Sequence, residues 1–401
     1  MRRTFIILAI VIVLAGIGVG VYFYFFAGAA SVAVAPSGTT SLPTAGQTTT
    51  SSTGTTPTTT TSSSNTPTTV SARLVQISKG PVVPGEVVVN IPAPNASSSP
   101  EVSVHYIERQ SGNVFSYSVR AKKITRTSNR TVPGIQSASW LPDASVAFVR
   151  YLSGTDAETI NTYALPANGS SGFFLPKNLS DISVSSTNIL TLTSGVNGSA
   201  ASLERTDGTR PSTVFTTPLS ALRISFAGKS RYLAFTKPTA TLPGNAFLVD
   251  SAGRFSRIAG PLSGLVALPS SSGKWVLISY TLNNAMQLEL VNTDTSSILP
   301  LPVATIADKC AWAADDSAIY CGIPIDPPAT AVYPDDWYQG AVTLSDRIWK
   351  IDVAGRYAQL VLDFENETEN SLDAKALALD AAGTVLVFMN KNDSSLWSYS
   401  L

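Results

Sequence analysis

The sequence is poor in the residues that carry most enzyme chemistry. Its 401 residues include a single histidine, His105, and two cysteines, Cys310 and Cys321. A serine nucleophile needs a base, usually histidine, and no Gly-x-Ser-x-Gly turn accompanies His105. A zinc site needs several cysteine or histidine ligands at close spacing, which these three residues do not provide. The sequence therefore predicts no catalytic residue, no metal ligand and no cofactor.

Charge is also scarce. Charged residues make up 13% of the chain and the formal net charge is zero. Between Arg3 and Arg73 there is none, so the region from Arg73 onward carries 25 of the 27 basic residues and all 27 acidic ones. That region has no basic stripe, which argues against nucleic acid as a partner.

Residues 1–27 predict a cytoplasmic stub followed by a transmembrane signal anchor. Thr4–Phe26 contains no charged residue, and as a helix it would span roughly 34 Å, more than the ~30 Å hydrocarbon layer. Arg2 and Arg3 favour a cytoplasmic N-terminus, which places the rest of the chain outside the cytoplasm. The alternative is a cleaved signal peptide, since Ala27–Ala29 resembles a cleavage site, although the apolar region of such peptides is usually only about 7–15 residues.

Residues 28–72 predict a disordered linker. The segment is dominated by Ser, Thr, Pro and small residues and has almost no apolar surface to bury. Such a composition cannot offset the conformational entropy lost on ordering. The linker is either O-glycosylated or a bare tether.

Residues 73–401 contain a repeated hairpin pattern. In each copy an apolar or aromatic residue ends one strand, a polar turn follows, and a second apolar strand begins, as in "WLPDASVAFVRY". The residues that end the first strand are Trp140, Val184, Phe226, Leu268, Trp312 and Leu379, at spacings of 44, 42, 42, 44 and 67. A period of about 40–45 with short strands is typical of a β-propeller, in which each repeat forms one four-stranded blade. The longest spacing indicates a blade with an insertion.

The two ends of this region predict how the propeller closes. The chain ends in "LWSYSL", the third strand of its blade, whereas "RLVQIS" (Arg73–Ser78) reads as an outer strand with no blade of its own. Pairing the two would remove an exposed sheet edge. This gives seven blades; six or eight are the alternatives, because 171–217 is weakly patterned. No stretch shows a convincing helical period over about eleven residues, so the predicted fold class is all-β.

One repeat carries a family resemblance. "WLPDASVAF" (Trp140–Phe148) resembles the repeat of TolB-like, WD40-like bacterial propellers, whose usual form is Trp-Ser-Pro-Asp-Gly, two variable residues and an apolar strand. Ala144 stands where glycine is usual. The resemblance implies a propeller over 73–401 but no activity, because propellers serve as enzymes and as interaction modules.

The two cysteines flank the turn of the Trp312 hairpin. A turn over 314–317 places Cys310 directly opposite Cys321 on adjacent strands, within disulfide range. The predicted extracytoplasmic location favours oxidation. The alternative is a pair of buried thiols that act as small apolar residues.

Residues 322–346 form the predicted insertion, between the second and third strands of its blade. It should therefore emerge on the same face as the links from one blade to the next. The candidate binding residues crowd together in it: Tyr333, Asp335, Asp336, Trp337, Tyr338 and Gln339. Aromatic contact area combined with orienting carboxylates is typical of recognition sites. The alternative is that Trp337 and Tyr338 only pack the loop onto its own blade, with the aspartates as turn formers.

These features predict a membrane-tethered extracytoplasmic propeller that acts as a binding or scaffold module for a protein, peptide or glycan of the cell envelope and has no enzymatic activity. A purely structural component of the envelope is a further interpretation. The alternative is a carbohydrate-active hydrolase that uses carboxylates at the mouth of the propeller. An accessible acidic pair about 5–10 Å apart would favour the hydrolase, whereas an aromatic rim would favour the binding module.

Overall fold

The computed structural model describes residues 67–92, 100–368 and 370–401. The predicted anchor (1–27) and linker residues 28–66 lie outside this range. No helix within the described residues has the length and apolar character needed to cross a bilayer.

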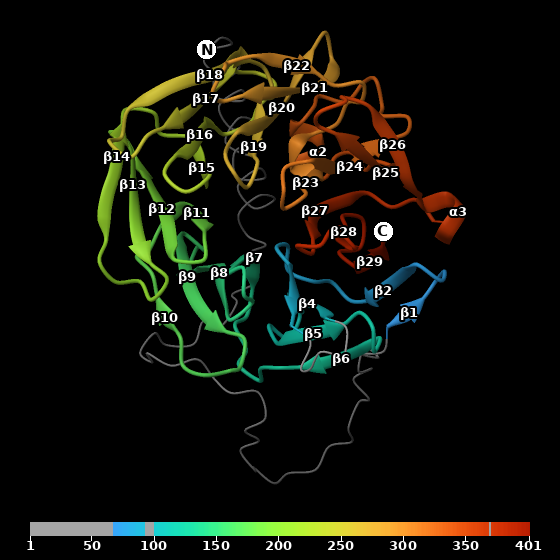
Figure 1. Cartoon of the computed structure of the whole chain (residues 1–401). Helices are drawn as coiled ribbons and strands as arrows, with labels where there is room; N and C mark the ends of the chain where they lie inside the picture. Colours follow the sequence, from blue (N-terminus) through green and yellow to red (C-terminus); the bar gives the residue numbers. More distant parts are fainter. Residues whose placement is uncertain (1–66, 93–99, 369) are drawn as a thin grey trace, which may run out of the picture. The chain divides into compact units, whose positions relative to one another are not determined.

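The described residues form a β-propeller of seven antiparallel sheets, as Figure 1 shows, which confirms the all-β prediction and the blade count. Blade 1 comprises β3 (Val87–Ile91), β4 (Glu101–Ile107), β5 (Val114–Ser118) and β6 (Lys123–Arg126). Blade 2 comprises β7 (Ile135–Trp140), β8 (Val146–Ser153), β9 (Thr159–Pro166) and β10 (Phe173–Phe174). Blade 3 comprises β11 (Leu179–Val184), β12 (Asn188–Gly195), β13 (Gly198–Arg205) and β14 (Ser212–Thr217).

The next three blades repeat this arrangement. Blade 4 comprises β15 (Leu222–Phe226), β16 (Tyr232–Thr236), β17 (Gly244–Val249) and β18 (Phe255–Leu262). Blade 5 comprises β19 (Val266–Pro269), β20 (Trp275–Leu282), β21 (Ala285–Asn292) and β22 (Ile298–Pro300). Blade 6 comprises β23 (Cys310–Trp312), β24 (Ala318–Pro324), β25 (Asp346–Asp352) and β26 (Ala358–Asp363).

Blade 7 closes the ring with strands from both ends of the described chain. It contains β27 (Ala374–Leu379), β28 (Val385–Asn390) and β29 (Leu396–Ser400), and its outer strand is β2 (Leu74–Ser78). The register pairs Leu74 with Tyr399 and Gln76 with Trp397. The predicted pairing of Arg73–Ser78 with the C-terminal strand is therefore confirmed.

The hydrophobic core lies between neighbouring blades. Middle strands such as β28, with the sequence VLVFMN, are buried at every position. One cluster joins Ile77 of β2 and Val387 of β28 to Tyr106 and Tyr117 of blade 1. Each sheet therefore packs both faces against its neighbours, which explains why these strands are continuously apolar rather than alternating.

Two details differ from the sequence prediction. β1 (Thr68–Thr69) pairs with β2, so the sheet includes residues assigned to the linker; the exposed edge of β2 offers backbone donors and acceptors that any extended segment can pair with. The insertion begins only after Pro324, and it contains a helix, α2 (Asp335–Gln339). A further short helix, α3 (Phe364–Thr368), follows blade 6.

The two faces of the propeller differ in the connections they carry. The insertion face carries the links between blades and the turns between the second and third strands, including the insertion. The opposite face carries the turns between the first and second strands, such as 141–145 of blade 2.

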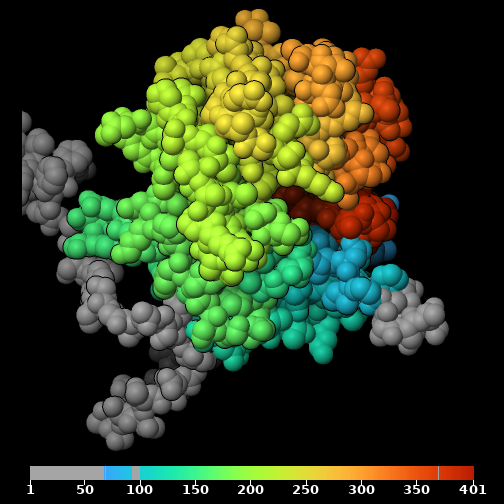
Figure 2. All heavy atoms as spheres, turned by 60° about the vertical axis from the view of Figure 1, so that its left-hand side comes forward, coloured from blue at the N-terminus to red at the C-terminus, as the bar shows by residue number. Residues whose placement is uncertain are grey.

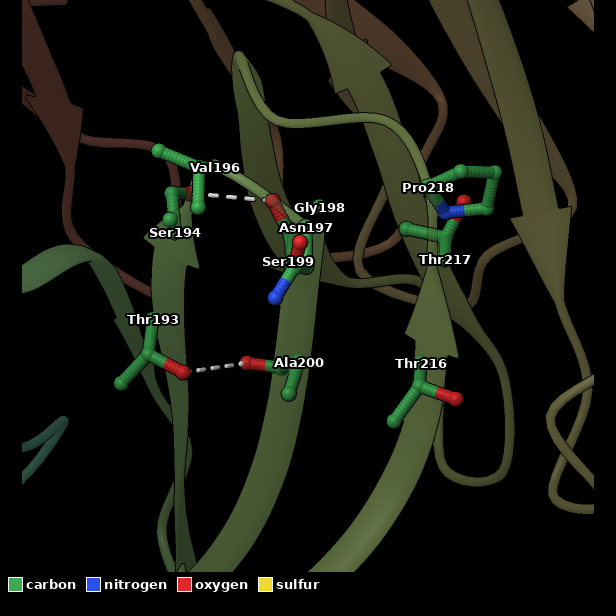
Figure 3. Close-up of a pocket in the computed structure, with 11 residues that line it drawn as sticks. Thr193, Ser194, Val196, Asn197, Gly198, Ser199, Ala200, Thr216, Thr217 and Pro218 are labelled. Carbon is green, nitrogen blue, oxygen red and sulfur yellow. Dashed lines mark hydrogen bonds between the residues drawn. The ribbon is translucent and has the colours of Figure 1, made fainter.

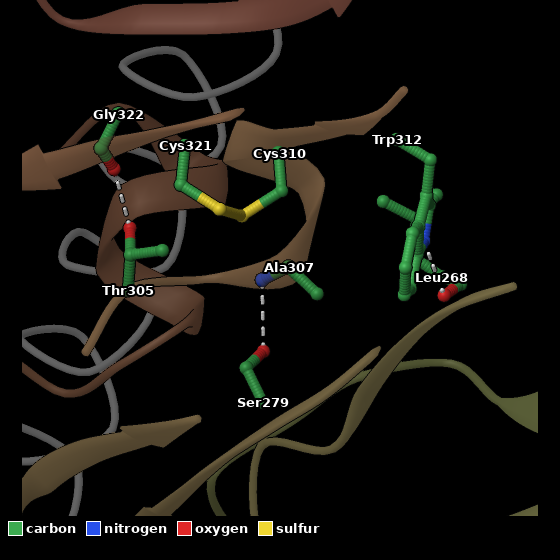
Figure 4. The surroundings of a disulfide bond; sticks show 8 residues. All are labelled: Leu268, Ser279, Thr305, Ala307, Cys310, Trp312, Cys321 and Gly322. Carbon is green, nitrogen blue, oxygen red and sulfur yellow. Dashed lines mark hydrogen bonds between the residues drawn. A yellow bond between two sulfur atoms is a disulfide. The ribbon is translucent and has the colours of Figure 1, made fainter. Parts of the chain in front are cut away.

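The structure joins Cys310 to Cys321 across β23 and β24 by a disulfide. Figure 4 shows two hydrogen bonds near the disulfide, both made by residues of the segment between blades 5 and 6. The Thr305 hydroxyl donates to the Gly322 carbonyl, and the Ala307 amide donates to the Ser279 hydroxyl. The bond therefore lies where blade 6 meets the link from blade 5.

Peptide mapping of the non-reduced protein is expected to recover a fragment that links Cys310 to Cys321. Replacing both cysteines by alanine is expected to lower the free energy of unfolding by about 3 kcal/mol, because the bond restricts the unfolded chain over a loop of roughly a dozen residues. Urea unfolding with and without reductant measures this difference. Two alkylatable thiols in the non-reduced protein would contradict the bond.

Candidate binding site

The insertion folds into a short helix rather than an extended loop. Asp335 and Asp336 occupy the first turn of α2, where carboxylates interact favourably with the helix dipole. Gly340 ends the helix in the left-handed region with φ of 79°, which glycine adopts without strain. The two aspartates therefore project from consecutive positions of a helix and not from alternate sides of a strand.

Two of the aromatic residues predicted to bind a partner are buried. Tyr333 and Trp337 are each only 3% exposed. The Trp337 indole Nε1–H donates to both carboxylate oxygens of Asp373, at 3.1 and 3.0 Å. Asp373 precedes the first strand of blade 7, so Trp337 attaches the insertion to the neighbouring blade as well as to its own.

The two aspartates are also engaged within the protein. Asp335 accepts hydrogen bonds from the Thr239 hydroxyl at 2.9 Å and the Ala240 amide at 3.2 Å, both in the β16–β17 loop of blade 4. Asp336 accepts from the Val332 amide at 2.7 Å. Asp335 therefore fastens the insertion to blade 4, and Asp336 fixes the insertion's own loop.

Tyr338 and Gln339 are the predicted binding residues that remain exposed. The Tyr338 hydroxyl donates to Asp308 at 2.7 Å, and Asp308 forms a bidentate pair with Arg223 of β15, at 2.7 and 3.1 Å. Burial alone would raise the pKa of Asp308, but the Arg223 guanidinium and the Tyr338 hydroxyl outweigh it and hold that pKa below its usual value. Tyr338 therefore lies beside an ordered ion pair that connects blade 4 to the segment just before β23, the first strand of blade 6.

A second charged group lies beneath the insertion. Lys309, in the 3-10 helix η1 (Ala307–Lys309), is fully buried and forms ion pairs with Asp346, at 2.7 Å, and with Asp373. Its Nζ also lies 5.0 Å from the centre of the Trp337 ring. Burial raises the pKa of Asp346 to about 6, with Lys309 acting against that rise and Asp373 adding to it. We call Lys309, Asp346 and Asp373 the lysine cluster. It fastens together the insertion and the links into blades 6 and 7.

The lysine cluster contains the nearest counterpart of a catalytic acidic pair. Asp346 and Asp373 converge on one lysine ammonium, but both are buried, with exposed fractions of 1% and 0%. The Ala374 amide donates to the same Asp346 oxygen that Lys309 contacts, and the other Asp346 oxygen is buried without a partner. The Leu344 amide donates to Asp373. The pair is therefore part of the structure of the blade junction and is closed to a substrate.

The insertion face carries exposed apolar side chains at the tips of neighbouring loops. Leu242 of blade 4, Leu282 of blade 5, and Val332 and Tyr338 of the insertion are 69%, 54%, 42% and 39% exposed. The loops that carry them are fastened to one another, because Asp335 holds 239–240 and Asn284 donates to the Ala329 carbonyl at 2.6 Å. We call these four residues the apolar rim. Of the four, Tyr338 contacts the Arg223–Asp308 pair, through its hydrogen bond to Asp308.

Space beside the buried part of the insertion is almost filled. The hollow walled by Tyr333 and Pro334 has about 10 Å³, at the lower limit for one water molecule. A wider hollow of about 730 Å³ lies at the tip of blade 3, between the Val196–Asn197 turn and Pro218 (Figure 3). The insertion therefore offers a surface for contact rather than a pocket.

Glu86, before the first strand of blade 1, is a buried acid that the sequence did not single out. It is 9% exposed, and neither carboxylate oxygen makes a hydrogen bond of good geometry. Burial raises its pKa to about 8, and the nearby amides of Glu86 and Gly85 and the charge of Lys375 only partly oppose the rise. At neutral pH the group is therefore mostly protonated.

The protein is expected to lose stability as the pH rises, because the buried Glu86 carboxyl must then give up its proton. Replacing Glu86 by glutamine is expected to abolish this loss. The folded state binds this proton up to about pH 8, whereas the carboxyl of the unfolded chain releases it near its ordinary pKa of 4.5. The free energy of unfolding should therefore fall between these two values, by roughly 1.4 kcal/mol per unit of pKa shift at most. Urea unfolding at pH 5, 7 and 9 should show that the free energy of unfolding of Glu86→Gln increases relative to that of the parent as the pH rises. Parallel profiles would contradict this, and the exposed Glu158→Gln is the matched control.

Comparisons with solved structures agree with the fold. Similar structures include oligogalacturonate lyase from Vibrio parahaemolyticus, with 6% identity and a TM-score of 0.54 over 82% of this chain and 93% of the lyase. The β-propeller domain of the Trilobed protease from Pyrococcus furiosus has 9% identity and a TM-score of 0.51, over 79% of this chain and 95% of that domain. TolB from Acinetobacter baumannii aligns over 79% of this chain and 80% of its own, with 11% identity and a TM-score of 0.41.

No family model and no curated protein matches the chain. At identities this low the structural likeness shows the fold alone. The class of the protein is therefore that of β-propellers, as the TolB-like resemblance implied, with the seven blades that the hairpin spacing and the two chain ends predicted.

Proposed function

We propose that this chain is a membrane-tethered, extracytoplasmic binding module whose insertion face binds a protein of the cell envelope. The observation that carries the proposal is the apolar rim, in which large apolar side chains from three consecutive blades lie exposed on one face and Tyr338 is bonded to the Arg223–Asp308 pair. The membrane tether and the location outside the cytoplasm rest on the sequence of residues 1–27, which lies outside the described residues.

The rim has the composition of a protein contact surface. Exposed apolar side chains that gather in one place, with polar groups among them, mark interaction sites more often than single exposed residues do. Tyrosine and arginine are the residues that most often dominate binding energy at such surfaces, and here Tyr338 stands beside Arg223. The buried side chains of the insertion hold its loop in position, so that little entropy would be lost on binding.

The proposal includes no catalytic step. The alternative, a carbohydrate-active hydrolase at the propeller mouth, needs two carboxylates that a substrate can reach. The paired carboxylates Asp346 and Asp373 are buried and both form ion pairs with Lys309. The geometry therefore supports binding better than hydrolysis.

Site-directed photo-crosslinking in cells tests the proposal. A photoreactive residue at Leu242 or Leu282 is expected to capture one and the same protein, whereas the same residue at Ile298, equally exposed on outer strand β22, should not. The captured protein, purified, should then bind the propeller directly. Leu242→Glu with Leu282→Glu should weaken that binding at least tenfold, and Ile298→Glu should leave it unchanged.

The proposal would be contradicted if neither rim position captured a protein, or if the Ile298 position captured the same protein as the rim. Equal binding by the rim variant and the Ile298→Glu control would contradict it as well. Folding of every variant is checked by its thermal unfolding, since all three positions are exposed and should tolerate the charge.

A further inference from the structure

The opposite face has a large hollow that the proposed function does not use. It has about 870 Å³ and is formed by the turns between the first and second strands of blades 2 to 5. Figure 2 brings the green to yellow blades, to which most of these turns belong, to the front of the molecule. The residues around the hollow are Pro142, Ser183, Val184, Ser185, Ser186, Thr187, Asn188, Phe226, Gly228, Lys229, Pro269, Ser270 and Ser271.

Hydroxyl groups dominate this wall. Six of its residues carry one, and Asn188 adds an amide. The side chains of Ser186, Ser271 and Lys229 are exposed and have no hydrogen-bond or ion-pair partner among the described residues. Donors and acceptors are therefore available from blades 3, 4 and 5 around one space.

Flat apolar surfaces complete the wall. Phe226 is half-buried, and its ring lies 5.8 Å from that of Tyr232, which supports it from within the blade. Pro142 and Pro269 contribute ring surfaces from blades 2 and 5. Such a hollow, with apolar faces and polar groups between them, has the size and composition of small-molecule sites.

The charge around the hollow is balanced. Lys229 is the one charged residue in its wall. Asp316 lies just outside and accepts a hydrogen bond from Ser270 at 2.8 Å, and Asp143 follows Pro142 directly. A polyanion or a polycation would meet charge of its own sign, whereas a neutral polar ligand would not.

The wall is held rigidly by contacts between blades. A Cβ at Gly228 would lie 2.3 Å from the Ser272 carbonyl oxygen, and one at Gly273 would lie 2.3 Å from the Ala227 carbonyl oxygen. The turns of blades 4 and 5 therefore pack together so closely that only glycine fits at both positions. A wall fixed in this way has little entropy to lose when a ligand binds.

We infer that this hollow binds a neutral saccharide, with a sugar ring against Phe226 and the sugar hydroxyls bonded to Ser186, Ser271 and Lys229. A pyranose presents C–H faces suited to flat apolar surfaces and hydroxyl edges suited to serine and lysine donors. The site is distinct from the apolar rim, since the two lie on opposite faces of the propeller. The inference therefore does not depend on the proposed function.

Saturation-transfer NMR of the propeller with cellotetraose, chitotetraose and mannotetraose tests the inference. At least one of the three is expected to bind. A tetramer of uronic acid and a neutral hexapeptide should bind at least tenfold more weakly than that sugar. Ser186→Tyr with Ser271→Tyr should fill the hollow and abolish binding, and Lys229→Met should weaken it several-fold.

Ser251→Tyr provides the control, because Ser251 is an exposed serine in a turn of blade 4 away from the hollow. Binding of none of the three sugars, or tighter binding of the peptide or the uronate, would overturn the inference. So would sugar binding that survives the double tyrosine variant while that variant keeps the parent's thermal unfolding. Rim variants such as Leu282→Glu should leave sugar binding unchanged, which separates this result from that for the protein partner.

Discussion

Replacing Lys309 by methionine is expected to destabilise the propeller by about 3–5 kcal/mol at pH 7, because it leaves two buried carboxylates without their shared cation. Lys309 is fully buried and pairs with both Asp346 and Asp373. The loss is a large part of the roughly 5–15 kcal/mol by which domains are usually stable. Urea unfolding at pH 7 measures it, and Lys79→Met, at an exposed lysine, is the control.

The pH dependence of this variant identifies the cause of the loss. Without the ammonium, the pKa of Asp346, already raised to about 6 by burial, should rise further. A proton then neutralises the carboxylate at low pH, so the cost of Lys309→Met should be smaller at pH 5 than at pH 8. Restoring neutrality with Asp346→Asn and Asp373→Asn should recover part of the stability at pH 7. A cost that is the same at every pH would contradict the electrostatic account.

Removing residues 1–79 is expected to abolish cooperative folding of the propeller. The deletion takes away β2, whose Leu74, Val75 and Ile77 are almost completely buried. Burial of each such side chain contributes roughly 1.5–3 kcal/mol, so the sum approaches the whole stability of a domain. It also leaves the edge of β29 unpaired. Thermal unfolding followed by near-ultraviolet circular dichroism should show no sharp transition.

A shorter deletion provides the control for this prediction. A chain that begins at Pro67 keeps every contact of the described residues, including β1 and β2. It should unfold at the temperature of the full chain. Cooperative unfolding of the chain without β2 at that same temperature would show that the ring does not need its N-terminal strand.

The fold could be predicted from the sequence because its signals are local and repeated. The regular spacing of residues such as Trp140 and Phe226 indicates successive blades. The unpaired outer strand near Arg73 and the incomplete last blade predict that the two ends pair to close the ring. The opposition of Cys310 and Cys321 follows from the position of a single turn. None of these inferences requires knowledge of how blades pack against each other.

The insertion could not be predicted in the same way, because contacts distant in the sequence decide it. Lys309 and Asp373 are 64 residues apart, and Trp337 is buried against their cluster and against the apolar core. Composition alone could not separate a binding aromatic from a buried one, so Trp337 and Tyr338 were predicted as equals although the structure exposes only Tyr338. Glu86 gave no signal either, since its burial depends on the neighbouring blades.

One signal in the repeats could have pointed to the charged groups. Arg223, Asp181 and Lys309 each stand three residues before the end of the first strand of a hairpin, where blades 2 and 5 have Ser137 and Leu265. A charged residue at this position lies near the start of the innermost strand of its blade. In the structure all three residues bind groups of another blade or of a blade link.

Hydrogen exchange of the full-length protein, followed by mass spectrometry, tests the closure of the propeller most directly. The account predicts that the amides of Leu74–Ser78 exchange as slowly as those of Leu396–Ser400, since the two strands share one ladder of hydrogen bonds. Fast exchange at Leu74–Ser78, with slow exchange in β28 of the same sheet, would contradict the account.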